Sequence, residues 1–298
     1  LSLGLRRTTD EFTSKQDNFI SILMPAPVIA AQTCDREVVT EYSSTTSRAV
    51  IQHDLTSGSN VYASLSEGFK AGGYATYECT EPYDPEEVTS LEFGYKGSLG
   101  ENTSLNASLF RYDYTDFQVL QVVGIQTVTR NAGDATVNGL ELEALSNLND
   151  SLSMSYGLTL LDATYGEFLN TNGLEPQLGQ QQLEGKYLNN APKVSVNLGL
   201  NYTTNLSSGS SLTYRANAAY KSKIYFSEFN EYSQSAYTIV DLNLIWESAD
   251  DRMRTRFYVK NATDEEYISG YLSSATGGGR FGQWGYPRTA GIEIQRNF

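Results

Sequence analysis

Apolar and polar side chains alternate with a period of two residues along several stretches of the chain. Within residues 193–203 (KVSVNLGLNYT), one parity carries only apolar side chains: Val194, Val196, Leu198, Leu200 and Tyr202. Successive side chains of a β-strand point to opposite faces of the sheet, so this pattern predicts strands with one apolar face. The same alternation recurs in residues 152–160, 212–220 and 240–246.

Short polar turns alternate with long connections along the chain. The turns contain the Gly, Ser, Asn and Asp residues typical of β-hairpins, at residues 56–59, 99–102, 149–151, 207–210 and 249–251. The long connections, which we expect to be irregular, are residues 18–45, 75–87, 166–185 and 270–279. This arrangement predicts roughly twelve strands, the last running from Arg280 to Phe298.

Strands joined by short turns at one end and long loops at the other are typical of a transmembrane antiparallel β-barrel. Only 40% of residues are apolar, yet 12% are aromatic and 21 are tyrosines, which suits the aromatic girdles of such barrels. No uncharged apolar stretch reaches the roughly 18 residues that a membrane helix needs. We therefore favour an all-β membrane barrel over a soluble β-sandwich or β-solenoid.

One stretch departs from the pattern. Leu105, Ala107 and Leu109 share one parity, whereas the bulky residues Phe110, Tyr112 and Tyr114 fall on the other. A β-bulge or a strand that extends beyond the bilayer would each explain the change, and the sequence does not choose between them.

Charge and cysteine content limit the chemistry that the chain can perform. A net charge of −14 opposes binding to a phosphate backbone, so we exclude nucleic acid as a partner. The two cysteines, Cys34 and Cys79, lack the spacing of a metal site, and we expect no metal and no cofactor. They form either a disulfide, in an oxidising compartment, or two separate thiols.

The titratable residues of the strands favour structural roles. The single histidine, His53, shares its parity with apolar neighbours, so we expect no Ser/His catalysis and no enzyme. Glu92 and Lys96 alternate with apolar residues, which places both on the inner face of a barrel, where we expect a lattice of ion pairs. The same role is predicted for Glu141, Glu143, Arg254, Arg256 and Lys260.

Six ordered motifs carry a more specific signal than the alternation does. They are VYASLSEGFKAGG (61–73), EVTSLEFGYKG (87–97), LFRYDYTDFQ (109–118), NAGDATVNGLELE (131–143), YVKNATDEEY (258–267) and YPRTAGIEIQRNF (286–298). In this order and spacing they resemble the C-terminal barrel of TonB-dependent outer-membrane receptors. The resemblance covers the chain from about residue 48 onward and is weaker over residues 1–10.

The resemblance implies a bacterial outer-membrane location and a barrel of roughly 22 strands, closed by an N-terminal plug. We expect residues 1–298 to be the C-terminal portion of such a barrel, with the plug and first strands missing, because the chain starts without Met or a signal peptide. The implied partners are outer-membrane lipid, the TonB energy-coupling complex and the barrel-assembly machinery. The terminal residues Ile292, Ile294 and Phe298 resemble the signal that this machinery reads.

The family resemblance implies energy-coupled uptake of a scarce, bulky nutrient, most often a ferric siderophore, with cobalamin, haem and oligosaccharides as other classes. The alternative is a passive pore or a structural or adhesive barrel without active transport. A small-molecule ligand such as a ferric chelate would meet the long loops first. The candidate contact residues there are Tyr74, Tyr77, Tyr83, Arg130, Asn131, Tyr225, Tyr232 and Trp284.

Overall fold

The computed structural model describes residues 1–17, 35–55, 58–74, 82–123, 126–131, 133–274 and 279–298. Twelve strands form one antiparallel sheet in the order β1-β2-β3-β4-β5-β8-β9-β12-β13-β16-β17-β20, which confirms the predicted all-β fold and strand number. The first six are β1 (Ser2–Asp17), β2 (Asp35–Asp54), β3 (Asn60–Lys70), β4 (Glu86–Ser98), β5 (Thr103–Thr115) and β8 (Ala135–Asn149). The others are β9 (Leu152–Tyr165), β12 (Val194–Asn205), β13 (Ser211–Lys221), β16 (Tyr237–Glu247), β17 (Met253–Lys260) and β20 (Thr289–Arg296).

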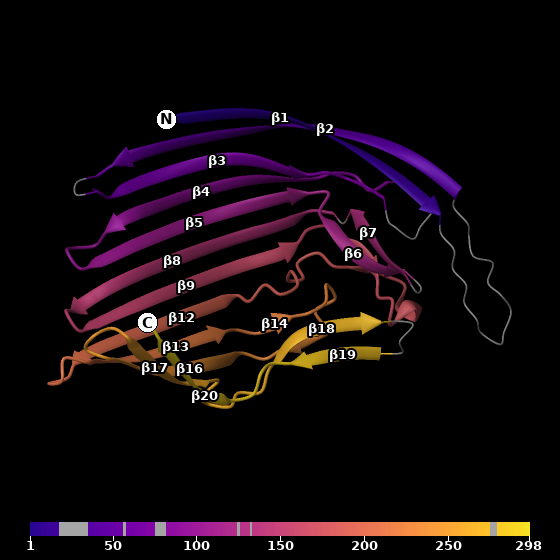
Figure 1. Cartoon of the computed structure of the whole chain (residues 1–298). Coiled ribbons are helices and arrows are strands. Elements are labelled where there is room, and N and C mark those ends of the chain that lie inside the picture. Colours follow the sequence, from indigo (N-terminus) through magenta and orange to yellow (C-terminus); the bar gives the residue numbers. More distant parts are fainter. Residues whose placement is uncertain (18–34, 56–57, 75–81, 124–125, 132, 275–278) are drawn as a thin grey trace.

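The sheet curves from β1 at one edge to β20 at the other, as Figure 1 shows. The short turns all lie at its left end in that view, and the long connections extend from its right end. Both chain termini lie at the short-turn end (Figure 1). The chain therefore collects its long connections on one side, as the sequence predicted.

The long connections contain structure of their own, so the expectation that they are irregular was wrong. Strand β2 begins at Asp35, inside the connection predicted over residues 18–45. Four small hairpins lie between strands of the main sheet: β6 (Gln118–Val123) with β7 (Gln126–Asn131), β10 (Leu169–Thr171) with β11 (Gln180–Gln182), β14 (Ile224–Tyr225) with β15 (Ser233–Gln234), and β18 (Ile268–Ser274) with β19 (Gly279–Trp284). Of these, β10–β11 lies within a predicted connection and β18–β19 overlaps another, whereas the other two lie outside the predicted ranges. The predicted last strand is consequently divided into β19 and β20. Pro287 lies in the break, where a residue without a backbone N–H cannot continue the ladder.

The two faces of the sheet differ in polarity, as the alternation predicted. Leu198 lies opposite Tyr156 on one side and Ala218 on the other, so apolar residues form continuous rows across strands. On this apolar face Leu198 is 45% exposed and Phe93 is 51% exposed. Large apolar side chains exposed on one face of a sheet suit contact with lipid. No helix of the described residues is long and apolar enough to cross a membrane.

The opposite, polar face accommodates aromatic rings by placing glycine beside them. Tyr62 lies opposite Gly94, Phe110 opposite Gly139, and Tyr258 opposite Gly291. A β-carbon at Gly94, Gly139 or Gly291 would come within 2.2–2.4 Å of the neighbouring aromatic side chain. Each ring therefore lies flat over a position that only glycine can occupy without displacement.

Strand β5 stays regular through the stretch that departed from the alternation. Its pairing with β4 and β8 runs through Tyr114 without a register shift, so the β-bulge explanation was wrong. Phe110 and Tyr112 stack on the polar face with ring centroids 4.8 Å apart. On the other face, Arg111 and Asp113 form an ion pair of 2.7 Å beyond Leu109. The strand thus continues past the apolar band, as the second explanation required.

Candidate functional site

The long connections pack around a small hydrophobic core of their own. Tyr165, Phe168, Leu183 and Phe229 expose 6% of their surface or less and form one cluster, which we call the loop core. Its members come from the end of β9, the β9–β12 connection and the β13–β16 connection. Phe117, Val119 and Leu188 pack against it. The connections at this end are therefore held by burial of apolar surface and not only by their attachment to the strands.

Three aromatic rings stack beside the loop core. The Tyr271 ring lies 5.7 Å from Phe226 and 5.3 Å from Tyr232, with interplanar angles of 14° and 15°. The guanidinium carbon of Arg280 lies 3.9 Å from the Tyr232 ring centroid, and the same guanidinium pairs with Glu175 at 3.3 Å. This aromatic stack joins the β13–β16 connection to the β18–β19 hairpin.

A cavity of about 90 Å³ lies between the aromatic stack and the β9–β12 connection. We call it the loop cavity. Its polar lining comes mainly from the segment SEFNEY (227–232), with Ser227, Glu228 and Glu231, and its aromatic lining includes Tyr232 and Tyr271. The remaining lining residues are Leu120, Thr171, Asn172, Gly173, Leu174 and Phe229.

The loop cavity is electronegative. The Asn170 amide donates to Glu228 Oε1 at 3.1 Å, and the Asn172 amide donates to Glu231 Oε2 at 3.0 Å. Burial, followed by the charge of Glu231, raises the pKa of the Glu228 carboxyl above its ordinary value. The pKa of the Tyr271 hydroxyl is raised by burial and by both carboxylates. Two carboxylates thus line one small space with neutral hydrogen-bond donors.

Two of the predicted ligand residues take part in aromatic clusters at this end. Tyr232 belongs to the aromatic stack, but Tyr225 points elsewhere. It stacks on Tyr187 at 5.9 Å, and the ammonium groups of Lys193 and Lys223 lie 3.9 Å and 4.4 Å from the Tyr187 and Tyr225 ring centroids. Tyr187 bridges to Thr164, which shares its parity with the apolar face. The structure therefore separates Tyr225 from the loop cavity.

The side chain of Asn131, another predicted ligand residue, forms its hydrogen bonds within the protein. Its Oδ1 accepts a hydrogen bond from the Asp84 N–H at 2.7 Å, and its Nδ2 donates to the carbonyls of Asp84 at 2.9 Å and Asp116 at 2.7 Å. These three bonds join the β3–β4 connection to the base of the β6–β7 hairpin. The geometry gives Asn131 a clamping role in loop structure.

Tyr74 and Tyr83 lie in the β3–β4 connection and contact strand β2. Thr40 Oγ1 donates to the Tyr74 hydroxyl at 3.0 Å, and the Tyr42 hydroxyl donates to the Tyr83 carbonyl at 3.1 Å. These contacts fix the connection against the wall. They do not bring either tyrosine to the loop cavity lining.

The other candidates lie apart from the loop cavity or outside the described residues. Arg130 lies in β7 opposite Val119 with an exposed side chain, and Trp284 ends β19 and is 67% exposed. Their contact with a ligand stays a prediction. Tyr77, Cys34 and Cys79 lie outside the described residues, and so does the disulfide question.

At the end of the chain, Ile292 and Ile294 lie on the apolar face of β20 with exposures of 63% and 66%. Phe298 follows this strand as the last residue. The alternation that suggested an assembly signal is therefore present in the structure. Its recognition by assembly machinery stays a prediction.

The polar face carries a second group of titratable residues. Glu92 accepts a hydrogen bond from the Tyr62 hydroxyl, and the Lys96 ammonium lies 5.2 Å from the Tyr62 ring centroid. Both therefore contact Tyr62, and neither takes part in an ion pair among the described residues, where a lattice of ion pairs was expected. With Glu141 and Glu143 they line a recess of about 260 Å³ on the wall.

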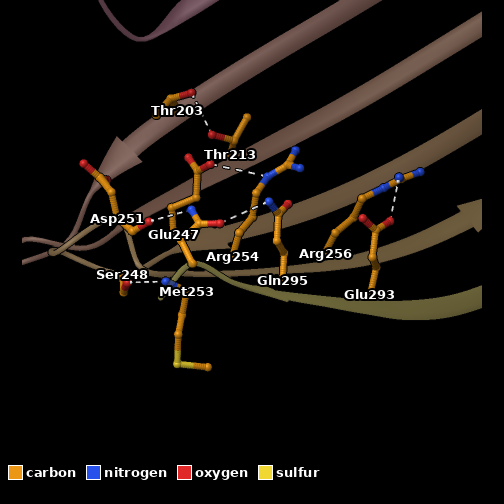
Figure 2. A network of polar contacts seen from close by, with 11 residues as sticks. Thr203, Thr213, Glu247, Ser248, Asp251, Met253, Arg254, Arg256, Glu293 and Gln295 are labelled. Carbon is orange, nitrogen blue, oxygen red and sulfur yellow. Dashed lines mark hydrogen bonds and ion pairs between the residues drawn. The ribbon is translucent and has the colours of Figure 1, made fainter.

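The predicted ion-pair lattice is present nearer the short turns, as Figure 2 shows. Arg254 pairs with Glu247 at 3.4 Å, and Arg256 pairs with Glu293 at 3.2 Å. Arg256 also donates to Asn243 Oδ1 at 2.9 Å. These contacts connect β16, β17 and β20 across the polar face. The prediction of a structural role for Arg254 and Arg256 is thus confirmed.

Sequence reasoning missed the main constituents of the loop cavity. Glu228 and Glu231 lie in the β13–β16 connection and Tyr271 lies in β18, and no spacing in the sequence relates Tyr271 to the two glutamates. The only local signal was the concentration of acidic and aromatic residues in SEFNEY (227–232).

Comparison with known proteins identifies a family model and several receptors that this chain resembles. The family model described as TonB dependent receptor-like, beta-barrel matches residues 1–262. The chain is similar to the ferrioxamine B receptor of Salmonella typhimurium strain SL1344, with 23% identity over 226 residues, which is 74% of this chain and 30% of that protein. It therefore spans about a third of the length of the curated relatives that it matches.

Solved structures show the same fold. The ferric yersiniabactin uptake receptor FyuA from Yersinia pestis superposes with a TM-score of 0.78 at 20% identity, covering 99% of this chain and 42% of that one. The ferric preacinetobactin receptor BauA from Acinetobacter baumannii gives a TM-score of 0.71 at 21% identity, covering 99% of this chain and 40% of that one.

Proposed function

The chain belongs to the TonB-dependent receptor-like β-barrel family, and from this premise we propose that it forms part of an outer-membrane receptor for a ferric siderophore. The observation that supports this best is the loop cavity, a polar and aromatic recess held by a packed core at the end where the long connections meet. The ferric chelates named for the similar receptors support the same class of cargo.

The two faces of the sheet support the proposed placement in the membrane. The apolar face, with Phe93, Leu198 and Phe257 between 45% and 51% exposed, would contact outer-membrane lipid. The polar face, with its ion pairs and acidic recess, would line the lumen. The long connections would then face the exterior, where a ligand arrives.

We propose that residues 1–298 are the C-terminal portion of a larger barrel whose other strands and plug lie elsewhere in the full-length protein. In the described sheet, β1 and β20 each have one neighbour, whereas a closed barrel leaves no edges. Transport would require the plug and the TonB complex, which pulls on a segment preceding the plug. The chain would perform no catalysis.

The acidic recess supports a docking role for the wall. Glu92, Glu141 and Glu143 line it with a single lysine, Lys96. A plug that presents basic side chains to this recess would offset the repulsion between the carboxylates. The wall would thereby hold the plug in place until energy coupling moves it.

The proposed function is tested by iron uptake in cells that carry or lack the full-length gene. With the gene intact, we expect cells to grow when a ferric hydroxamate or a ferric mixed-ligand siderophore is the iron source, and to accumulate radiolabelled iron from it. Both should be lost when the gene is deleted or when the TonB complex is inactivated. Uptake of a small sugar through general porins is the control and should not change.

Uptake that persists without the TonB complex would contradict active transport and indicate a passive pore. A deletion that changes cell attachment but no iron-chelate uptake would indicate an adhesive barrel. Either result would overturn the proposed function.

A further inference from the structure

We propose that the loop cavity binds a protonated primary amine at one end of the cargo, so that the receptor selects cationic ferric chelates over neutral ones. This inference rests on the proposed function and adds the chemical class of the ligand group. It is argued from the charges, the hydroxyl groups and the aromatic walls of the loop cavity.

The carboxylates of the loop cavity have no cationic partner within the described part of the chain. The ion pairs there include neither Glu228 nor Glu231, although each accepts a hydrogen bond from an asparagine amide. The nearby Arg280 is engaged by Tyr232 and Glu175. Glu228 is largely withdrawn from solvent, whereas Glu231 is exposed at the edge of the loop cavity. A carboxylate in the position of Glu228 is ordinarily paired with a cation, so the loop cavity offers its negative charge to a ligand.

A second, independent feature is a pair of hydroxyl groups without partners. The side-chain oxygens of Ser227 and Tyr271 each expose less than 1 Å² and make no hydrogen bond. Both residues line the loop cavity. Buried hydroxyls without partners are unfavourable, so these oxygens indicate that a bound group completes the site.

A primary ammonium matches this set of groups. It carries three donors and no acceptor, and the loop cavity presents carboxylate and hydroxyl oxygens that accept hydrogen bonds. Tyr232 and Tyr271 add aromatic walls to the loop cavity, although their ring faces are engaged by stacking on each other, by Phe226 and by Arg280. An anionic end group would meet two carboxylates and be repelled.

The size of the loop cavity restricts it to one end of the cargo. Its volume of about 90 Å³ is well above the roughly 10–15 Å³ that one water requires. It is far below the roughly 300–1,000 Å³ of a pocket for a drug-sized molecule. An aminoalkyl end would enter, while the ferric centre would remain outside.

The test uses two ferric trihydroxamate chelates that differ only in a terminal group, a free primary amine in one and its N-acetyl derivative in the other. Binding to the full-length receptor in lipid nanodiscs is measured by titration calorimetry at pH 7.5. We expect the acetylated chelate to bind at least about tenfold more weakly, since it forfeits charge-assisted hydrogen bonds.

Matched variants assign any preference to the loop cavity. Glu231→Gln keeps the size of the side chain and should bring the two affinities to within about threefold of each other. Glu184→Gln, an exposed position on the β9–β12 connection outside the loop cavity lining, should preserve the full preference. Tyr271→Phe keeps the ring and removes the hydroxyl, and should lower the preference by an intermediate factor.

Equal affinities of the unaltered receptor for the two chelates would overturn the amine inference and leave the proposed siderophore function standing. A preference that Glu231→Gln and Tyr271→Phe both leave intact would also overturn the assignment to this loop cavity. If neither chelate binds a receptor that is folded by circular dichroism, the amine inference is overturned, whereas the proposed function is decided separately by the iron-uptake experiment.

Discussion

Leu183 tests whether the long connections form a core that is stable apart from the strands. Its side chain is fully buried at 0% exposure in the loop core, against Tyr165, Phe168 and Phe229. Substitution of a buried leucine by alanine costs about 2.7–5 kcal/mol, because it removes apolar contacts and leaves a cavity. A loss of about 3 kcal/mol corresponds to a roughly hundredfold larger open population.

We therefore expect Leu183→Ala to accelerate amide hydrogen exchange by about two orders of magnitude in residues 166–188 and 225–232. The central strands, such as β12 and β13, should keep their protection, since their bonds do not depend on the loop core. Chelate affinity should fall as well, because Phe229 in the loop core also lines the loop cavity.

The matched control is Leu178→Ala in the short helix η2 (Pro176–Leu178), where the leucine is 54% exposed. This substitution should change the rate of amide hydrogen exchange in the loops by less than about fivefold. If Leu183→Ala leaves amide hydrogen exchange in the loops unchanged, the loop core does not contribute substantially to their stability. Equal acceleration in β12 and β13 would refute its independence from the sheet.

Three further predictions concern the wall and the charge of the loop cavity. Gly139→Ala should lower folding yield in lipid by displacing the ring of the opposite phenylalanine, 2.2 Å from the new β-carbon, whereas Gly157→Ala meets ordinary contacts of 3.5 Å or more and should fold normally. Leu198→Lys should reduce the free energy of unfolding in bilayers by about 2–4 kcal/mol, whereas Asn197→Lys on the polar face should not, and equal effects would contradict the assigned faces. Because the pKa of Glu228 is raised above the ordinary 4.5 in the folded protein, the stability of the loops should decline as the pH rises from about 4.5 through the raised pKa. Glu228→Gln should abolish this decline when melting is followed as a function of pH. A decline that the variant leaves unchanged would count against the burial of this charge.

The alternation in the sequence was sufficient to assign the two faces of the strands. Leu198 and Leu200 share a parity and Asn197 and Gly199 share the other, because the period of a strand is two wherever it lies in the sheet. Hairpin turns were equally predictable, since Gly, Asn, Asp and Ser adopt turn conformations through local chemistry. These local rules determined the strand number and the class of the fold.

Register and loop packing required the tertiary structure. The sequence showed Phe110 out of step with its neighbours, but only the pairing of β5 with β8 places Gly139 under its ring. The loop cavity likewise combines Glu228, Glu231 and Tyr271 from connections that are about 40 residues apart in the chain. Such contacts depend on which long connections pack together at the end of the sheet. The periodicity of a strand does not determine this packing. The sequence by itself therefore determined the wall, while the tertiary structure alone decided the site.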